Sequence, residues 1–101
     1  MTEQYIYHLI GKEEWCRAKQ KGVLEPASLQ KEGFIHFCEK SQIETVLEFE
    51  DKPKQELVAL KVKPSQVEED LNYENKFPHL YRKLKPQDVE ETEPLTKVDY
   101  S

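Results

Sequence analysis

The stretch GFIHFC, residues 33–38, places a single histidine in an apolar run of a chain in which 35% of the residues are charged. Alternation predicts an extended strand with Phe34, His36 and Cys38 on one face and Ile35 and Phe37 on the other. Both faces are apolar, which is typical of a strand covered on both sides. We therefore expect this strand to lie inside the fold, and His36 to have either a structural or a functional role.

The segments before and after this strand predict alternating strands and helices. QYIYHLI, residues 4–10, indicates a central strand with two apolar faces. Residues 11–22 predict a helix that turns Trp15 and Ala18 toward the core and ends at Gly22, and residues 27–31 predict one helical turn. SQIETVLEF, residues 41–49, predicts a second helix opened by a capping box of Ser41 and Glu44.

The second half of the chain predicts mainly strands. A break at DKPK, residues 51–54, precedes a strand at 56–62, and PSQVEED then indicates a turn or short helix. LNYENKFPHLYRKL predicts two short strands around a turn at Asn75 and Lys76, with Pro78 at an edge or irregular position. A helical turn at 86–89, a last strand and a loose end follow. The expected fold is α+β, a small split or mixed sheet with two main helices.

Composition limits the function. With 101 residues we expect a single domain, residues 1–101. The net charge of -5 disfavours nucleic acid or an anionic membrane as partner. Neither an export signal nor a long apolar stretch is present in the sequence, and the two cysteines form no C-x-x-C, so we expect a reduced cytoplasmic protein. It should be a monomer, because no long exposed apolar stripe is predicted.

The histidines are the main candidates for chemistry, because the usual phosphate-loop, dinucleotide, zinc-protease and nucleophile-elbow motifs are missing. His8, His36 and His79 all lie in apolar or aromatic settings. Burial would keep an imidazole neutral, able both to donate and to accept a hydrogen bond. The alternative is a core histidine bonded to a backbone carbonyl.

Other site chemistries are less well supported. The histidines lie 28 and 43 residues apart with no carboxylate at ligand spacing, so no metal is expected. Cys38 could be a nucleophile, although a small core residue is the simpler interpretation. Glu74 could orient a nucleophile or a ribose hydroxyl, or be a solvated turn residue. Tyr81 and Phe77 alternate with His79 and could stack on a flat ring, or belong to the core.

Several stretches together resemble one bacterial family, the domain of unknown function 952. They are IYHLI (6–10), Trp15 with Ala18 and Gly22, PASLQKEGFIHFC (26–38) with Gln42 after it, and FPHLY (77–81). The resemblance implies a strongly bent sheet similar to the ADP-ribosyltransferase-like fold, whose enzymes bind NAD in a cleft. Arg82 departs from the family's usual glycine, and Cys38 from its usual serine.

The resemblance also implies roles for individual residues. His8 would grip the ribose of NAD, Ser28 and Leu29 would form part of the pocket wall, and His36 would lie inside the pocket. His79 and Tyr81 would close the pocket, with Glu74 as the acidic residue. NAD would be a substrate, and its glycosidic bond would break through an oxocarbenium-like state that needs positioning and charge stabilisation.

Three readings of the function follow. The chain is an NAD- or nucleotide-utilising transferase or glycohydrolase with His8, His36 and His79 as catalytic residues, or a non-catalytic module that binds a small nucleotide-like ligand. The third reading is a structural or regulatory protein with core histidines.

Overall fold

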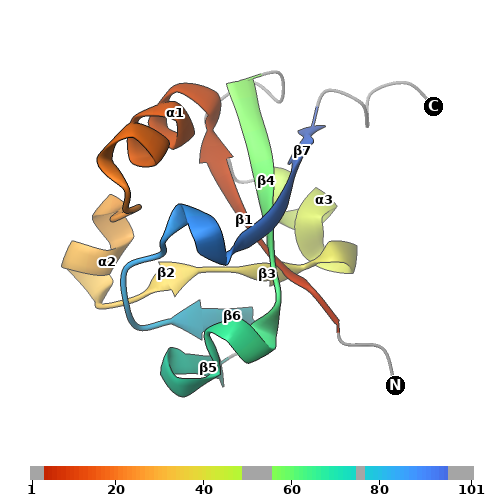
Figure 1. The fold of residues 1–101 in the computed structure, drawn as a ribbon. Coiled ribbons are helices and arrows are strands. Elements are labelled where there is room, and N and C mark those ends of the chain that lie inside the picture. The colour runs from red at the N-terminus through yellow and green to blue at the C-terminus, as the bar shows by residue number, and fades with distance from the viewer. Residues whose placement is uncertain (1–3, 49–55, 75–76, 96–101) are drawn as a thin grey trace.

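The chain folds into two antiparallel sheets with short helices around them (Figure 1). The computed structural model describes residues 4–48, 56–74 and 77–95. One sheet has the order β3-β1-β4-β7, built from Cys38–Glu39, Ile6–Gly11, Leu57–Val62 and Val89–Pro94. The other has the order β2-β6-β5, built from Ile35–His36, Phe77–Leu80 and Leu71–Glu74. The predicted α+β class and split sheet are confirmed, and every described strand pairing is antiparallel rather than mixed.

The segment 33–39 joins the two sheets, as the continuous yellow ribbon of Figure 1 shows. In β2, His36 pairs with His79 of β6, whereas in β3 Cys38 pairs with Tyr7 of β1. Phe37 lies at the change of partner, and its N–H donates to the carbonyl of Pro78 at 3.0 Å. The single strand predicted here is therefore two short strands, because the extended chain leaves one sheet and enters the other.

Pro78 was predicted at an edge or irregular position. It lies in β6, the middle strand of its sheet, so the edge position is wrong, whereas the end of the β2–β6 ladder beside it makes the position irregular. A proline cannot donate to a neighbouring strand. Here β2 ends at His36, and Pro78 lies one residue beyond the last pair of the β2–β6 ladder. The missing N–H therefore coincides with the point at which β2 leaves this sheet.

The helices are α1 (Lys12–Lys21), α2 (Ala27–Glu32) and α3 (Ile43–Leu47). In α1, Trp15 and Ala18 are buried as predicted, and Gly22 ends the helix at φ 86°, where its N–H donates to the carbonyl of Ala18. The left-handed conformation suits glycine because it has no Cβ to clash. The helical turn predicted at 27–31 is confirmed as α2.

The start predicted for the second helix is wrong. The chain already turns in the 3-10 helix η1 (Lys40–Gln42), and the side-chain amide oxygen of Gln42 accepts a bond from the N–H of Glu39 at 2.8 Å. Glu39 and Gln42 therefore cap the turn in place of Ser41 and Glu44. The apolar period is confirmed, because Ile43 is buried in α3 and Val46 packs against the same cluster.

Three further 3-10 helices confirm the turns predicted in the second half of the chain: η3 (Pro64–Gln66), η4 (Glu68–Asp70) and η5 (Pro86–Asp88). The predicted break at 51–54, the turn at 75–76 and the loose end at 96–101 lie outside the described residues. Arg82, the departure from the family pattern, bridges two of these turns through ion pairs with Asp70 and Asp88.

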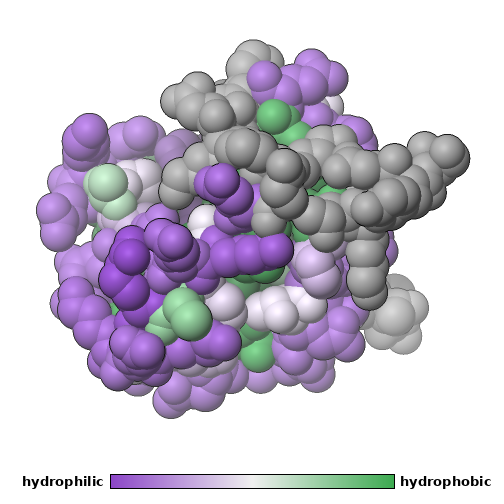
Figure 2. Space-filling view, turned by 90° about the horizontal axis from the view of Figure 1, so that it is seen from above, coloured by the Kyte–Doolittle hydropathy of each residue, from purple (hydrophilic) through white to green (hydrophobic). Residues whose placement is uncertain are grey.

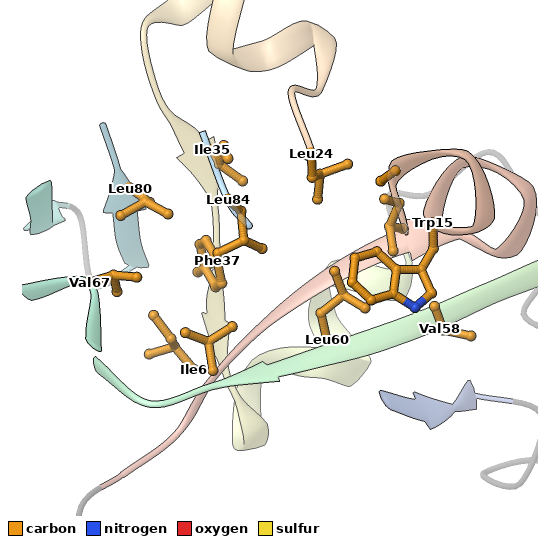
Figure 3. Close-up of a cluster of buried hydrophobic side chains, with 13 residues drawn as sticks. Ile6, Trp15, Leu24, Ile35, Phe37, Val58, Leu60, Val67, Leu80 and Leu84 are labelled. Atoms are coloured by element: carbon orange, nitrogen blue, oxygen red, sulfur yellow. The ribbon is translucent and has the colours of Figure 1, made fainter. Parts of the chain in front are cut away.

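Two apolar clusters cover the two faces of the larger sheet. Along β4, Val58 and Leu60 belong to the first cluster, whereas Leu57 and Ala59 belong to the second. Figure 3 shows the first cluster, in which Trp15 of α1 and Ile35 of β2 belong with Leu60 of β4. Strand β1 lies between β3 and β4, so the prediction of a central strand with two apolar faces is confirmed. On the face shown in Figure 2, hydrophilic residues cover most of the described surface.

Candidate functional site

All three histidines of the chain line one cavity of about 580 Å³. The cavity lies where β1, the segment of β2 and β3, α3 and β6 meet. Aromatic or apolar side chains form the rest of its lining: Tyr7, Leu9, Phe34, Phe37, Cys38, Val46 and Phe77. Its size is that of a small-molecule site.

Strand register brings the histidines together. His36 of β2 and His79 of β6 are directly opposite each other, and their ring centroids are 5.6 Å apart. The His8 ring of β1 reaches the same segment, because its Nδ1 lies 2.7 Å from the carbonyl oxygen of His36. Strand β1 and the histidine-bearing segment of the other sheet are thus joined by a hydrogen bond at the cavity.

The bond to His36 also fixes the tautomer of His8. A carbonyl oxygen can only accept, so Nδ1 must carry the proton, and Nε2 is left with its lone pair. Burial lowers the pKa of His8 to about 4, although the backbone hydrogen bond opposes this shift. His8 is therefore a neutral imidazole at physiological pH, whose second nitrogen is a hydrogen-bond acceptor.

The other two histidines each lie beside a carboxylate. His36 Nε2 is 3.0 Å from Oε1 of Glu32, with both side chains about half exposed. His79 is largely buried, and its Nδ1 is 3.5 Å from Oε1 of Glu74. That contact is too long for a good hydrogen bond, and the buried Nδ1 has no hydrogen-bond partner in the described part of the chain.

Phe34 packs against both of these imidazoles. Its ring stacks on His79 at a centroid distance of 4.0 Å and an interplanar angle of 9°, and meets the edge of His36 at 4.8 Å. Sequence reasoning did not name Phe34 as a site residue. The signal was present, because alternation already placed Phe34 on the face of His36 and Cys38.

Cys38 belongs to the core rather than to a nucleophile pair. It is buried in the second cluster, and burial, with Glu39 nearby, raises the pKa of its thiol to about 11. A thiol must ionise to attack, so this environment disfavours nucleophilic chemistry at neutral pH.

Sequence comparison shows the family of the chain. The family described as "Protein of unknown function (DUF952)" matches residues 9–92. The chain belongs to this family. The resemblance inferred from IYHLI, GFIHFC and FPHLY is thereby confirmed at the level of the family.

Solved structures of another protein share the fold. The crystal structure of CC0527 from Caulobacter crescentus is 32% identical, with a TM-score of 0.79, over 87% of this chain and 82% of that chain. Its solution NMR structure gives 31% identity and a TM-score of 0.77 over 89% and 83%. No curated protein matches the chain. The name CC0527 states no activity.

Not every residue expected at the site lines the cavity. Ser28 and Leu29 lie in α2 outside the lining, and Leu29 packs against the first core cluster. Glu74 and Tyr81 lie just behind it: the Tyr81 hydroxyl donates to Oε2 of Glu74 at 2.5 Å, and its ring is 5.3 Å from that of Phe34. This hydrogen bond raises the pKa of Tyr81. The assigned roles of all these residues stay predictions.

Within residues 4–48, 56–74 and 77–95, no cluster of three or more His, Cys, Asp and Glu side chains could hold a metal ion. In the same ranges, no helix is both long and apolar enough to cross a membrane.

Proposed function

We propose that this cavity binds a nucleotide-like ligand through a flat ring and a ribose hydroxyl, with NAD as the candidate. The observation that carries the proposal is the convergence of three imidazoles from β1, β2 and β6 on one apolar cavity. A neutral imidazole is suited to hold a hydroxyl, and aromatic walls are suited to a heterocycle. The family resemblance implies an ADP-ribosyltransferase-like fold, whose enzymes bind NAD, and this expectation leads to the same ligand.

His8 is the residue proposed to hold the ribose. Its Nδ1–H is already bonded to the carbonyl of His36, so Nε2 is the nitrogen that accepts from a ligand hydroxyl. The ring cannot rotate without breaking that bond. Because His8 stays neutral, it offers this acceptor over the whole physiological pH range.

Phe34 and Phe77 are proposed to contact the heterocycle. Both line the cavity, and Phe34 is already held in a parallel stack with His79. A flat ring inserted beside them would gain offset stacking beyond the burial of its area. The cavity volume of about 580 Å³ accommodates a nucleoside-sized group.

Binding rather than catalysis is the function that the geometry supports best. Cleavage through an oxocarbenium-like state is helped by negative charge placed beside C1′. Among residues 4–48, 56–74 and 77–95, no carboxylate lines the cavity, and Glu74 stands behind His79 with Oε2 bonded to Tyr81. A binding module therefore needs no rearrangement of the site, whereas an enzyme does.

Cleavage or transfer at the NAD glycosidic bond is the second candidate function, favoured by the contact between Glu74 and His79. The C1′–N bond would break with its electron pair passing to nicotinamide, and water or another hydroxyl would attack C1′ and lose its proton. Rotation of the exposed Glu74 into the cavity would supply the stabilising charge. In this case Glu74→Gln would lower nicotinamide release at least 100-fold while changing the Kd for NAD less than threefold.

The test is an NMR titration of the protein with NAD, nicotinamide riboside and ADP-ribose. We expect the resonances of His8, His36 and His79 to shift at millimolar ligand or below. His8→Asn keeps a donor near the position of Nδ1 and removes the Nε2 acceptor, so it should weaken binding about fivefold, the equivalent of about 1 kcal/mol. Gln20→Ala, on the exposed side of α1, is the matched control and should leave the Kd unchanged. Absence of shifts around the cavity at millimolar ligand would overturn the proposal.

A further inference from the structure

Each of the three cavity histidines has an oxygen atom beside one of its ring nitrogens. A backbone carbonyl stands at Nδ1 of His8, and carboxylates stand at Nε2 of His36 and at Nδ1 of His79. A carbonyl or an ionised carboxylate only accepts hydrogen bonds, whereas a neutral imidazole has one donor and one acceptor nitrogen. The neighbouring oxygen therefore favours a proton on the nitrogen that it faces, and the other nitrogen becomes the acceptor.

The carboxylate beside His79 is placed there by strand register. Glu74 of β5 is the cross-strand partner of Phe77 in β6, so their side chains share a face of the smaller sheet, and alternation along β6 adds His79 to that face. Tyr81 follows β6 directly, and its N–H donates to the carbonyl of Asp70 at 2.8 Å. The register thus brings one carboxylate between an imidazole and a phenol.

The Tyr81 hydroxyl fixes the position of this carboxylate. It donates to Oε2 of Glu74 at 2.5 Å, a short distance typical of a hydroxyl bonded to a charged oxygen. The other oxygen, Oε1, then lies 3.5 Å from Nδ1 of His79. The Glu74 side chain is 45% exposed, so without the hydroxyl the carboxylate would regain its rotamer freedom and turn into water.

The ring of His79 is held in place by its neighbours. Phe34 stacks on it at 4.0 Å, and the Tyr81 ring lies 5.3 Å from the same Phe34. Nδ1 of His79 is buried, with no hydrogen-bond partner among the described residues. At 3.5 Å a carboxylate oxygen attracts an N–H and repels a nitrogen lone pair, so the proton of a neutral His79 belongs on Nδ1.

We infer that Tyr81 is a positioning residue, which holds Glu74 beside Nδ1 of His79 and thereby leaves Nε2 of His79 as a hydrogen-bond acceptor for the ligand. The inference rests on the proposed function and goes further, because it adds a second acceptor nitrogen to Nε2 of His8 in the same cavity. A ligand that uses both nitrogens must donate at two points, as a group with two hydroxyls does. Phosphate and carboxylate oxygens only accept, so they do not match this pair.

NMR reads the tautomer of His79 directly. In spectra of the 15N-labelled protein at pH 8, where an ordinary imidazole is neutral, the protonated and unprotonated ring nitrogens have clearly different shifts. Wild type should carry the His79 proton on Nδ1. Tyr81→Phe keeps the ring beside Phe34 and removes only the hydroxyl, so the population of the Nδ1–H form should fall at least twofold.

Glu74→Gln should invert the tautomer. The Tyr81 hydroxyl still donates to the side-chain oxygen, so the amide NH2 takes the place of Oε1 and donates toward Nδ1 of His79, whose proton moves to Nε2. Tyr73→Phe is the matched control. It removes a hydroxyl from the residue before Glu74, which pairs with Pro78 on the opposite face of the sheet, and should leave the His79 tautomer unchanged.

The binding measurement compares two probes with the same heterocycle. Nicotinamide riboside carries ribose hydroxyls, and 1-methylnicotinamide carries none. Tyr81→Phe and Glu74→Gln should each raise the Kd of nicotinamide riboside at least threefold and leave that of 1-methylnicotinamide unchanged, whereas Tyr73→Phe should change neither value. In the cleavage candidate Glu74→Gln leaves the affinity nearly constant, so this measurement also separates a positioning role of Glu74 from a catalytic one.

Two results would overturn the inference and leave nucleotide binding intact: a wild-type His79 protonated on Nε2, or a tautomer that Tyr81→Phe does not change. If the tautomer changes but the Kd of nicotinamide riboside does not, or if both probes weaken equally, no ligand hydroxyl uses Nε2 of His79 and the inference fails. If NAD, nicotinamide riboside and ADP-ribose shift no cavity resonance of wild type, the proposed function fails, and the role of Nε2 in ligand binding fails with it.

Discussion

His8 should make the stability of this protein depend on pH in a measurable way. The pKa of His8 is about 4 in the folded chain, whereas an unburied histidine has a pKa of 6.5. Between these pH values the unfolded chain therefore binds a proton at His8 and the folded chain does not. The contribution of neutral His8 to stability is fully present above pH 6.5. It is lost as the pH falls from 6.5 toward 4, because protonation favours the unfolded state.

The magnitude follows from the two pKa values. A difference between 6.5 and about 4, at about 1.36 kcal/mol for each unit, corresponds to about 3 kcal/mol of unfolding free energy. The loss should approach about 1.4 kcal/mol per pH unit between the two values. For a small domain this is a large share of the total stability.

Urea denaturation between pH 4.5 and 7.5 is the assay, with wild type and His8→Asn compared at each pH. Subtraction removes the titration of the carboxylates, which is common to both proteins. The stability of wild type relative to the variant should fall by about 2 kcal/mol or more from pH 7 to pH 4.5. Leu60→Ala is the non-titrating control, because Leu60 is fully buried and pairs with His8 across β1 and β4. It should lower the unfolding free energy by about 2–5 kcal/mol, and by the same amount at every pH.

Two results would refute the reasoning. One is a constant difference between wild type and His8→Asn over the whole pH range. The other is an NMR titration in which the His8 ring protonates at pH 6.5, which would mean that the ring is hydrated in the folded protein.

Two further predictions concern helix α1 and the thiols. Gly22→Ala should lower the unfolding free energy by about 1 kcal/mol in thermal or urea denaturation. The cause is backbone strain at φ 86°, because an added Cβ meets no atom within 4 Å. Gly22→Asn should lower the unfolding free energy less, and an equal loss would count against backbone strain as the cause. In the native protein at pH 8, a thiol reagent such as DTNB should modify the exposed Cys16 quickly and the buried Cys38 only after unfolding. Cys16→Ser isolates Cys38, and rapid reaction of that variant without denaturant would contradict the burial.

Much of the secondary structure could be predicted, because local signals there agree with the tertiary packing. Acidic residues early, basic residues late and Gly22 at the end defined α1, and the stretch ELVALKV, residues 56–62, defined β4 at Leu57–Val62. The capping box failed because Ser41 and Glu44 have the right spacing but the chain begins to turn at Lys40. Spacing alone does not reveal where the preceding strand stops.

The candidate site was predicted in part. The sequence singled out the three histidines by their apolar settings, and the fold brings all three to one cavity. It did not name Phe34, and it placed Ser28 and Leu29 at the pocket, where the structure has them in α2 outside the lining. Which side chains meet depends on strand partners far apart in the sequence, and no local pattern specifies them.

GFIHFC shows which features depend on the sequence alone and which depend on the tertiary structure. The sequence by itself determined that the chain after Gly33 becomes extended, that Phe34, His36 and Cys38 share a face, and that both faces are apolar, since alternation and hydrophobicity are local properties. Only the tertiary structure decided that the segment changes sheets at Phe37, that His36 faces His79, and that His8 donates to the His36 carbonyl. Strand register is set by packing over long sequence separations, and it is this register that turns three dispersed histidines into one site.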